Sequence, residues 1–177
     1  MFIDQDRFIY KDSLLSCSDV FLEEYPLIHN VFQYPEKIHN GKWTTSPILY
    51  RSKNKEKWYN NHVCQRSLKI LKNTNNIFIA TYSILKSGAI VEPHVGFDLE
   101  HPVFRVHLPL IVPKPTREGV IIPDKDCWIR VGGETKTWKT GELFVFDDTI
   151  EHEVQNNTEE DRVILLMDFT KEAFMEV

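Results

Sequence analysis

The pattern of apolar and polar positions changes once along the chain, near residue 77. Upstream of it, residues 13–28 carry apolar side chains at helical spacing behind a serine that can cap the first turn, although Pro26 indicates an early end. Residues 55–72 carry a second such set, roughly on one side. The stretch between these two predicted helices is irregular and aromatic, which favours loops and an edge strand.

From residue 77 onward, short runs rich in β-branched and aromatic residues alternate with turn residues. The turns contain glycine at 87–88, 132–133 and 140–141. No helical pattern separates the runs, so a parallel α/β sheet is not expected, and an antiparallel double-sheet roll is the natural way to close them. The predicted strands are residues 77–85, 90–94, 103–112, 127–131, 135–139, 143–146 and 162–169.

These elements predict a mainly β protein, a double-stranded β-helix (cupin-like jelly roll) with the N-terminal helices packed on one outer face. The 177 residues are enough for one domain with a continuous core. We therefore expect a single domain over residues 1–177. Within it, residues 1–76 form a helical lead-in with edge elements, and residues 77–169 form the jelly-roll core.

The amino-acid composition limits which class of protein and which kinds of binding partner are expected. With 42% hydrophobic and 27% charged residues the chain is typical of globular domains. Its formal net charge is −5 and its basic residues are scattered, so we expect no nucleic-acid partner. Acidic residues near the N-terminus and the lack of an apolar run of roughly 20 residues predict a cytoplasmic protein without a membrane span. Three widely spaced cysteines predict reduced thiols: Cys17, Cys64 and Cys127.

Two of the seven histidines occur where a ligand is expected. His94 closes one predicted strand, and His152 follows a strand and an acidic turn, at the start of another strand. In a jelly roll such positions can meet at the mouth of the barrel, where a metal can be held. From the residues alone, the alternative that each is a partly buried histidine bonded to a neighbour stays open.

Three further polar residues indicate a polar interior. Arg162 opens the apolar run 163–167, where its charge is costly unless paired, and a small dicarboxylate suits its two-pronged donor geometry. Ser83 on the first predicted strand can add a hydroxyl donor. Arg105 and His107 lie two apart in a strand and so share a face, which should look into the roll.

Other conspicuous residues have simpler interpretations. Trp128 and Trp138 are expected to pack in the core or at its rim. Asp147 and Asp148 are expected to form a turn, and because adjacent strand residues point to opposite sides, they are not expected to form a coupled acid pair.

A family resemblance is carried by five segments and four single residues. The segments are YSI at 82–84, PHVG at 93–96, FRVHL at 104–108, GELFVFDD at 141–148 and EHEV at 151–154, and the single residues are Gly88, Trp138, Arg162 and Asp168. Together they resemble the aspartyl/asparaginyl β-hydroxylase family of Fe(II)/2-oxoglutarate oxygenases. The resemblance covers about residues 77–169, and the FDD and EHEV segments are its most specific part. Residues 1–76 match only loosely.

That resemblance implies that His94 and His152 bind Fe(II). The usual non-haem site adds a carboxylate two residues after the first histidine. In this sequence that position is Gly96, an omission that the family shares, so water or another small ligand would fill it. Asp98, the nearest acid, lies two residues beyond the expected position. The vacancy leaves halogenation open as an alternative to hydroxylation.

The resemblance also implies the cosubstrate and substrate contacts. Ser83, His107 and Arg162 would hold 2-oxoglutarate, with Arg162 on its distal carboxylate. Arg105 would face the substrate, an amino acid or an amino-acid side chain in a peptide, whose C–H bond is hydroxylated with dioxygen. Val103 stands where vertebrate-type members carry a second arginine, which weakens the case for an aspartate side chain. A non-catalytic jelly roll that binds a small carboxylate is a further alternative.

Overall fold

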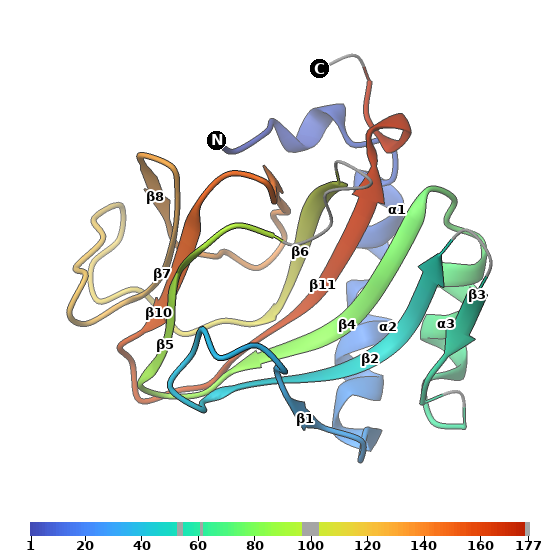
Figure 1. Cartoon of the computed structure of the whole chain (residues 1–177), viewed down its shortest axis with the longest axis horizontal. Helices are drawn as coiled ribbons and strands as arrows, with labels where there is room; N and C mark the ends of the chain where they lie inside the picture. The colour runs from blue at the N-terminus through green and yellow to red at the C-terminus, as the bar shows by residue number, and fades with distance from the viewer. Residues whose placement is uncertain (53–54, 61, 97–102, 176–177) are drawn as a thin grey trace.

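Two antiparallel sheets face each other in the computed structural model, which describes residues 1–52, 55–60, 62–96 and 103–175 (Figure 1). The larger sheet has the strand order β1-β2-β4-β11-β6-β9, with β3 beside β2, and the smaller sheet has the order β5-β10-β7-β8. The strands are β1 (Phe32–Gln33), β2 (Trp43–Ser52), β3 (Lys55–Trp58), β4 (Ile77–Leu85), β5 (Ala89–His94), β6 (Val103–Ile111), β7 (Cys127–Val131), β8 (Glu134–Lys136), β9 (Phe144–Asp147), β10 (His152–Asn156) and β11 (Arg162–Thr170).

The connections between the strands confirm the double-stranded β-helix. Strands β4, β6, β9 and β11 lie in the larger sheet, whereas β5, β7, β8 and β10 lie in the smaller one. The chain therefore crosses repeatedly between two facing sheets, as it does in a jelly roll. Strand β11 is central in the larger sheet and is covered on both faces, which explains why its sequence is apolar without alternation.

Helices cover the outer face of the larger sheet, as predicted (Figure 1). Leu14, Phe21 and Leu71 are fully buried there against apolar residues of the sheet. Among the described residues, no helix has the length and apolar character that crossing a bilayer requires. The helical elements are η1 (Gln5–Arg7), α1 (Lys11–Ser16), α2 (Ser18–Glu24), η2 (Tyr25–Leu27), α3 (Gln65–Lys72) and η3 (Lys171–Ala173).

Two predictions for the N-terminal region were wrong in detail, and a third was incomplete. The helix expected over 13–28 is interrupted at Cys17, which ends α1 and precedes α2. The helix expected over 55–72 begins as strand β3, and α3 forms only from Gln65, because Asn60 adopts a left-handed backbone with φ of 51° between them. The aromatic stretch does contain the expected edge strand, β1, but it also contains β2, an interior strand that the sequence did not predict and that is flanked by β4 on one side and by β1 and β3 on the other.

Two apolar clusters result from this layering. One lies between the helices and the larger sheet, and the other fills the space between the two sheets. The inner cluster is interrupted by buried polar side chains at Ser83, His107 and Arg162. These are the residues that position a candidate site inside the roll.

Candidate functional site

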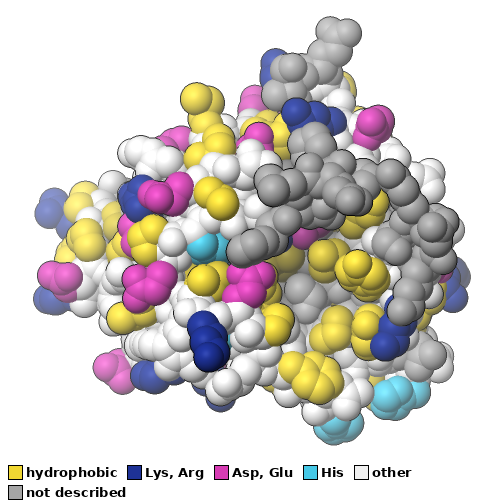
Figure 2. Space-filling view, in the orientation of Figure 1, with side chains coloured by type: hydrophobic (Ala, Val, Ile, Leu, Met, Phe, Trp, Pro, Cys, Tyr) yellow, Lys and Arg dark blue, Asp and Glu magenta, His cyan; other side chains and the backbone are white. Residues whose placement is uncertain are grey.

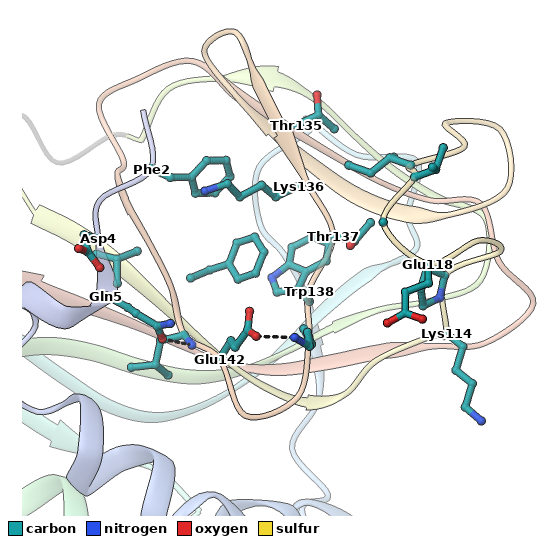
Figure 3. A pocket seen from close by; sticks show the side chains of 18 of the residues that line it. Phe2, Asp4, Gln5, Lys114, Glu118, Thr135, Lys136, Thr137, Trp138 and Glu142 are labelled. Atoms are coloured by element: carbon teal, nitrogen blue, oxygen red, sulfur yellow. Dashed lines mark hydrogen bonds and ion pairs between the residues drawn. The ribbon is translucent and has the colours of Figure 1, made fainter.

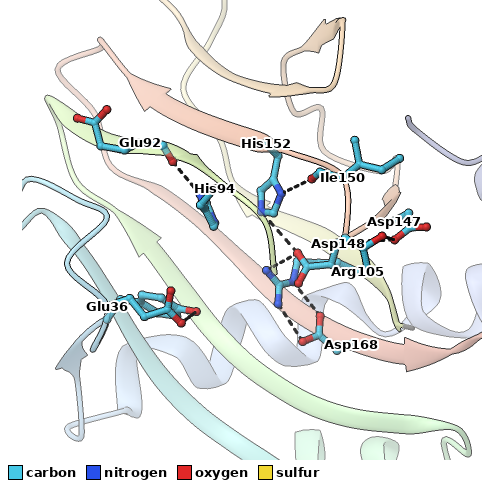
Figure 4. Close-up of polar contacts among 11 residues, drawn as sticks. Glu36, Glu92, His94, Arg105, Asp147, Asp148, Ile150, His152 and Asp168 are labelled. Carbon is cyan, nitrogen blue, oxygen red and sulfur yellow. Dashed lines mark hydrogen bonds and ion pairs between the residues drawn. The ribbon is translucent and has the colours of Figure 1, made fainter. Parts of the chain in front are cut away.

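His94 and His152 are direct cross-strand partners at the ends of β5 and β10. Their ring centroids lie 4.2 Å apart (Figure 4). The Nδ1 atom of His94 lies 2.7 Å from the carbonyl oxygen of Glu92, and that of His152 lies 2.9 Å from the carbonyl oxygen of Ile150. Because a carbonyl only accepts, both Nδ1 atoms carry the proton, and both Nε2 atoms are left as potential metal ligands.

The environment keeps both imidazoles neutral at physiological pH. Burial lowers the pKa of His152 to about 3 and also lowers the pKa of His94. The neutral imidazole is the form that coordinates a metal. Within the part of the chain that the structure describes, no group of three or more His, Cys, Asp or Glu residues is arranged to hold a metal ion. Among the described residues, the imidazoles of His94 and His152 are therefore the candidate metal ligands.

Gly96 and Asp148 together occupy the place where a third ligand would be expected. A Cβ atom on Gly96 would lie 1.8 Å from Oδ2 of Asp148, so the carboxylate fills the space that a side chain would need. Oδ1 of Asp148 is 3.5 Å from Nε2 of His152, and burial raises the pKa of Asp148 to about 6. Asp148 was expected only to form a turn, and the position of its carboxylate beside residue 96 and His152 was not predicted. Asp98 lies outside the described residues.

All six predicted site residues line one cavity between the sheets. The cavity is walled by apolar side chains from both sheets, including Trp43 and Phe146. The predicted site residues in its lining are Ser83, His94, Arg105, His107, His152 and Arg162.

Arg162, in the lining of this cavity, is a buried cation without a carboxylate partner among the described residues. Its side chain comes from the start of β11, the residue is 3% exposed, and its Nε and Nη1 atoms have no hydrogen-bond partner among the described residues. Burial lowers the pKa of Arg162 to about 10. Its guanidinium carbon lies 4.6 Å from the centroid of the Trp138 ring. A buried charge in this state strongly favours an anionic ligand.

Two neutral donors accompany Arg162. Nδ1 of His107 accepts a hydrogen bond from Nε1 of Trp138 at 3.2 Å, and Nε2 of His107 is buried without a partner among the described residues. Burial and the charge of Arg162 lower the pKa of His107 well below its usual value. Oγ of Ser83 accepts a hydrogen bond from Nε1 of Trp43 at 2.9 Å, so its own proton is free to be donated.

Arg105 is engaged by two carboxylates of the protein itself. Its Nε and Nη2 atoms donate to the two oxygens of Asp168 at 2.8 and 3.0 Å, and its Nη1 lies 2.7 Å from Oδ1 of Asp148 (Figure 4). Burial disfavours the charge of Arg105, but Asp168 and Asp148 outweigh it and raise the pKa of the guanidinium. No local pattern in the sequence indicates this cluster, because Arg105 and Asp168 become neighbours only when β6 pairs with β11.

The segment before β2 supplies a rim that the sequence analysis did not include in the site. The ring of Tyr34 stacks on that of Trp43 with centroids 3.8 Å apart, and burial raises the pKa of Tyr34 to about 12. Glu36 lies across the site from Arg105 in Figure 4. Figure 2 shows a small histidine surface with hydrophobic and acidic side chains beside it. The rim therefore combines aromatic surface with negative charge.

Comparison with known sequences finds a matching family and related hydroxylases. Residues 22–172 match the family described as Aspartyl/Asparaginyl beta-hydroxylase. The chain is 40% identical over 87 residues to the human protein named aspartyl/asparaginyl beta-hydroxylase, a match that covers 49% of this chain and 10% of that protein. It is 34% identical over 108 residues to the ornithine lipid ester-linked acyl 2-hydroxylase of Rhizobium tropici, covering 61% of this chain and 35% of that protein. The chain thus spans well under half the length of these relatives.

Solved structures with low sequence identity show the same fold. A protein of Burkholderia pseudomallei described as an oxidoreductase of the 2OG-Fe(II) oxygenase family superposes with a TM-score of 0.62 at 11% identity, covering 90% of this chain and 80% of that one. A prolyl-4-hydroxylase of Pseudomonas putida superposes with a TM-score of 0.55 at 15% identity, covering 93% and 89%. These similarities agree with the double-stranded β-helix that the strand order defines.

Proposed function

This chain belongs to the aspartyl/asparaginyl β-hydroxylase family, and from that premise we propose that it hydroxylates a C–H bond with Fe(II), 2-oxoglutarate and dioxygen. The reaction would convert substrate, dioxygen and 2-oxoglutarate into hydroxylated product, succinate and carbon dioxide. We propose that the substrate is an amino acid or an amino-acid side chain of a peptide.

The two cross-strand histidines suit the metal. Nε2 atoms of His94 and His152 would hold Fe(II), while the carbonyl oxygens of Glu92 and Ile150 fix both rings through Nδ1. When bound together with 2-oxoglutarate, Fe(II) supplies the oxidation of an unactivated C–H bond by dioxygen. The protein's own task is to position the substrate and to keep water out of the apolar-walled cavity.

The observation that carries the proposal is the unpaired cation at Arg162. Arg162 is buried, and two of its nitrogen atoms, like Nε2 of His107 beside it, have no partner within the described ranges. A carboxylate placed between them would accept two charge-assisted hydrogen bonds from Arg162 and one more from His107, with Ser83 as a further donor. A dicarboxylate would satisfy these donors with one end and direct its other end toward the histidine pair. Because the cavity has a volume of only about 20 Å³, the side chains that line it would have to move apart to admit such a ligand.

The contacts of Arg105 differ from those that we expected from the sequence, in which Arg105 would face the substrate. Its guanidinium already binds Asp168 and Asp148, so one positive charge faces two negative charges. A substrate carboxylate would have to compete with both. We propose that Arg105 chiefly orders these two acids beside the metal site, and that an acidic side chain is a poor substrate.

Hydroxylation is favoured over halogenation by Asp148. A halide ligand would need the space beside Gly96, and that space holds the carboxylate of Asp148. Two anions at that distance repel each other strongly in a buried site. We infer from this contact that hydroxylation is favoured over halogenation.

The test is Fe(II)-dependent turnover of 2-oxoglutarate. We expect succinate to form only when Fe(II) and dioxygen are present, and Arg162→Met to abolish its formation. Candidate substrates should include free amino acids, peptides with asparaginyl or aspartyl residues, and ester-linked acyl lipids, because the names of the relatives span these classes. The expected product gains one oxygen atom, and chloride should not alter its mass. Binding of 2-oxoglutarate without any succinate formation would instead support a non-catalytic carboxylate-binding protein.

A further inference from the structure

Trp138 lies between an outer hollow and the two buried donors His107 and Arg162. On its outer side is a hollow at the edges of β8 and β9, with Phe2, Lys136 and Glu142 around it (Figure 3). On its inner side are His107 and Arg162, which line the cavity between the sheets. Trp138 itself is 3% exposed and does not line that inner cavity. Any effect of Trp138 on a ligand bound there must pass through His107 and Arg162.

The indole N–H determines which nitrogen of His107 carries the proton. Nε1 of Trp138 lies 3.2 Å from Nδ1 of His107. An indole nitrogen only donates, so Nδ1 must accept, and the single proton of the neutral ring sits on Nε2. That Nε2–H is buried without a partner among the described residues, in a ring that lines the inner cavity.

The face of the same indole contacts the other buried donor. The guanidinium carbon of Arg162 lies 4.6 Å from the ring centroid, which is within the range of a cation–π contact. A tryptophan face is the best aromatic surface for a desolvated cation. One side chain therefore contacts both donors, His107 through its N–H and Arg162 through its ring.

We propose that Trp138 is a positioning residue for 2-oxoglutarate, because it holds the His107 proton on Nε2 and the Arg162 guanidinium in place for the distal carboxylate. The inference rests on the proposed function, since it assigns the ligand of those two donors. A packing role needs only the aromatic ring, whereas a positioning role also needs the N–H. This difference makes the two roles separable.

The native protein gives the first test. Long-range proton–nitrogen NMR spectra of the histidine side chains, with the His107 signals assigned through His107→Gln, report which ring nitrogen is protonated. We expect His107 to show an unprotonated Nδ1 and a protonated Nε2 before any ligand is added. A proton on Nδ1 of native His107 would overturn the inference, and this measurement needs no variant at position 138.

The second test removes the N–H but keeps an aromatic ring at position 138. In Trp138→Phe we expect His107 to populate both tautomers and the dissociation constant for 2-oxoglutarate to rise about ten-fold, a factor that corresponds to about 1.4 kcal/mol. The affinity for Fe(II) should stay native. Trp128→Phe is the matched control, because Trp128 is also buried but donates its N–H to the carbonyl oxygen of Pro123, 3.0 Å away. The control should bind 2-oxoglutarate as the native protein does.

The outcomes separate the inference from the function on which it rests. Native affinity of Trp138→Phe for 2-oxoglutarate would overturn the positioning role and leave the proposed function intact. Equal losses in Trp138→Phe and Trp128→Phe would also overturn it, since they would indicate a general packing effect. Failure of the proposed function would appear separately, as a native protein that does not bind 2-oxoglutarate.

Discussion

The carboxylate of Asp148 lies where a side chain on residue 96 would have to go. A Cβ atom on Gly96 would come within 1.8 Å of Oδ2 and 2.9 Å of the carbonyl oxygen of Asp148, and the N–H of Gly96 donates to that carbonyl at 2.7 Å. The carboxylate of Asp148 therefore requires a residue without a side chain at position 96. As a result, an acid lies beside His152 although this acid does not belong to the strand that carries His94.

Gly96→Ala should damage the site through this contact. The added methyl group must displace a buried carboxylate and the backbone behind it, and overpacking of this kind costs about 1–3 kcal/mol. We expect a lower free energy of unfolding in urea and weaker Fe(II) binding. Gly133→Ala is the control, because a Cβ atom there meets no atom within 4 Å. Equal stability and equal Fe(II) affinity in the two variants would rule out the steric account.

Arg162→Met should stabilise the ligand-free protein while it removes cosubstrate binding. The buried guanidinium has no carboxylate partner in the part of the chain that the structure describes. Replacing a poorly compensated buried charge by an apolar side chain of similar volume can add about 1–4 kcal/mol to the free energy of unfolding. Urea unfolding without 2-oxoglutarate measures the gain, and calorimetry measures the lost binding. Arg130→Met, at a partly exposed arginine paired with Glu153, should show no comparable gain. A destabilised Arg162→Met protein would contradict the assignment of Arg162 as a ligand-binding cation.

Asp168→Asn should be strongly destabilising because it breaks a buried two-pronged ion pair. Loss of one partner of such a pair costs about 3–5 kcal/mol, since the remaining charge of Arg105 stays buried. The double variant Arg105→Met/Asp168→Leu should recover only part of the loss, because it removes both members of this pair but leaves buried Asp148 without its cation. Glu142→Gln, which breaks an exposed pair with Lys139, should cost less than about 1 kcal/mol. A loss in Asp168→Asn no larger than that of the surface control would show that the cluster does not stabilise the fold.

Stability should fall when the pH drops below about 6.5, the ordinary pKa of histidine. Burial and the nearby arginines keep His107 neutral in the folded protein, whereas His107 of the unfolded chain takes up a proton. The unfolded state then binds more protons, so acid favours unfolding by up to about 1.4 kcal/mol per pH unit for each such histidine. His152, with its pKa near 3, adds to the same slope.

His107→Gln isolates the contribution of His107. Glutamine can still accept from Trp138 and donate into the cavity, but it cannot be protonated. We expect a shallower dependence of the unfolding free energy on pH between 7.5 and 5.5 than in the native protein. The opposite contribution of Asp148, whose pKa is raised to about 6, is common to both proteins and cancels. Identical slopes would contradict the assignment of a neutral, buried His107.

The fold and the principal site residues followed from local patterns in the sequence. Strands β4 and β7 match their predicted ranges, because short β-rich runs between turn residues are a local signal. The convergence of His94 and His152 followed from the ends of the strands that carry them. The start of β3 was mistaken for helix because its Trp58 fits an apolar pattern that continues into α3.

What the sequence could not predict depends on long-range pairing. Arg105 meets Asp168 only through the register of β6 on β11, and no spacing along the chain encodes that contact. The closeness of Asp148 to Gly96 likewise depends on how two loops meet at the mouth of the roll. Trp138 was taken for a packing residue because burial alone does not reveal the partner of an indole N–H.

The central claim is that two imidazoles hold Fe(II) in the same cavity in which Arg162 anchors 2-oxoglutarate. Anaerobic titration of the protein with Fe(II) and 2-oxoglutarate, followed by visible absorption, tests it most directly. The account predicts a charge-transfer band that requires both additions and that is lost in His94→Ala and in His152→Ala. A band that survives in either histidine variant, or that fails to form in the native protein, would contradict it.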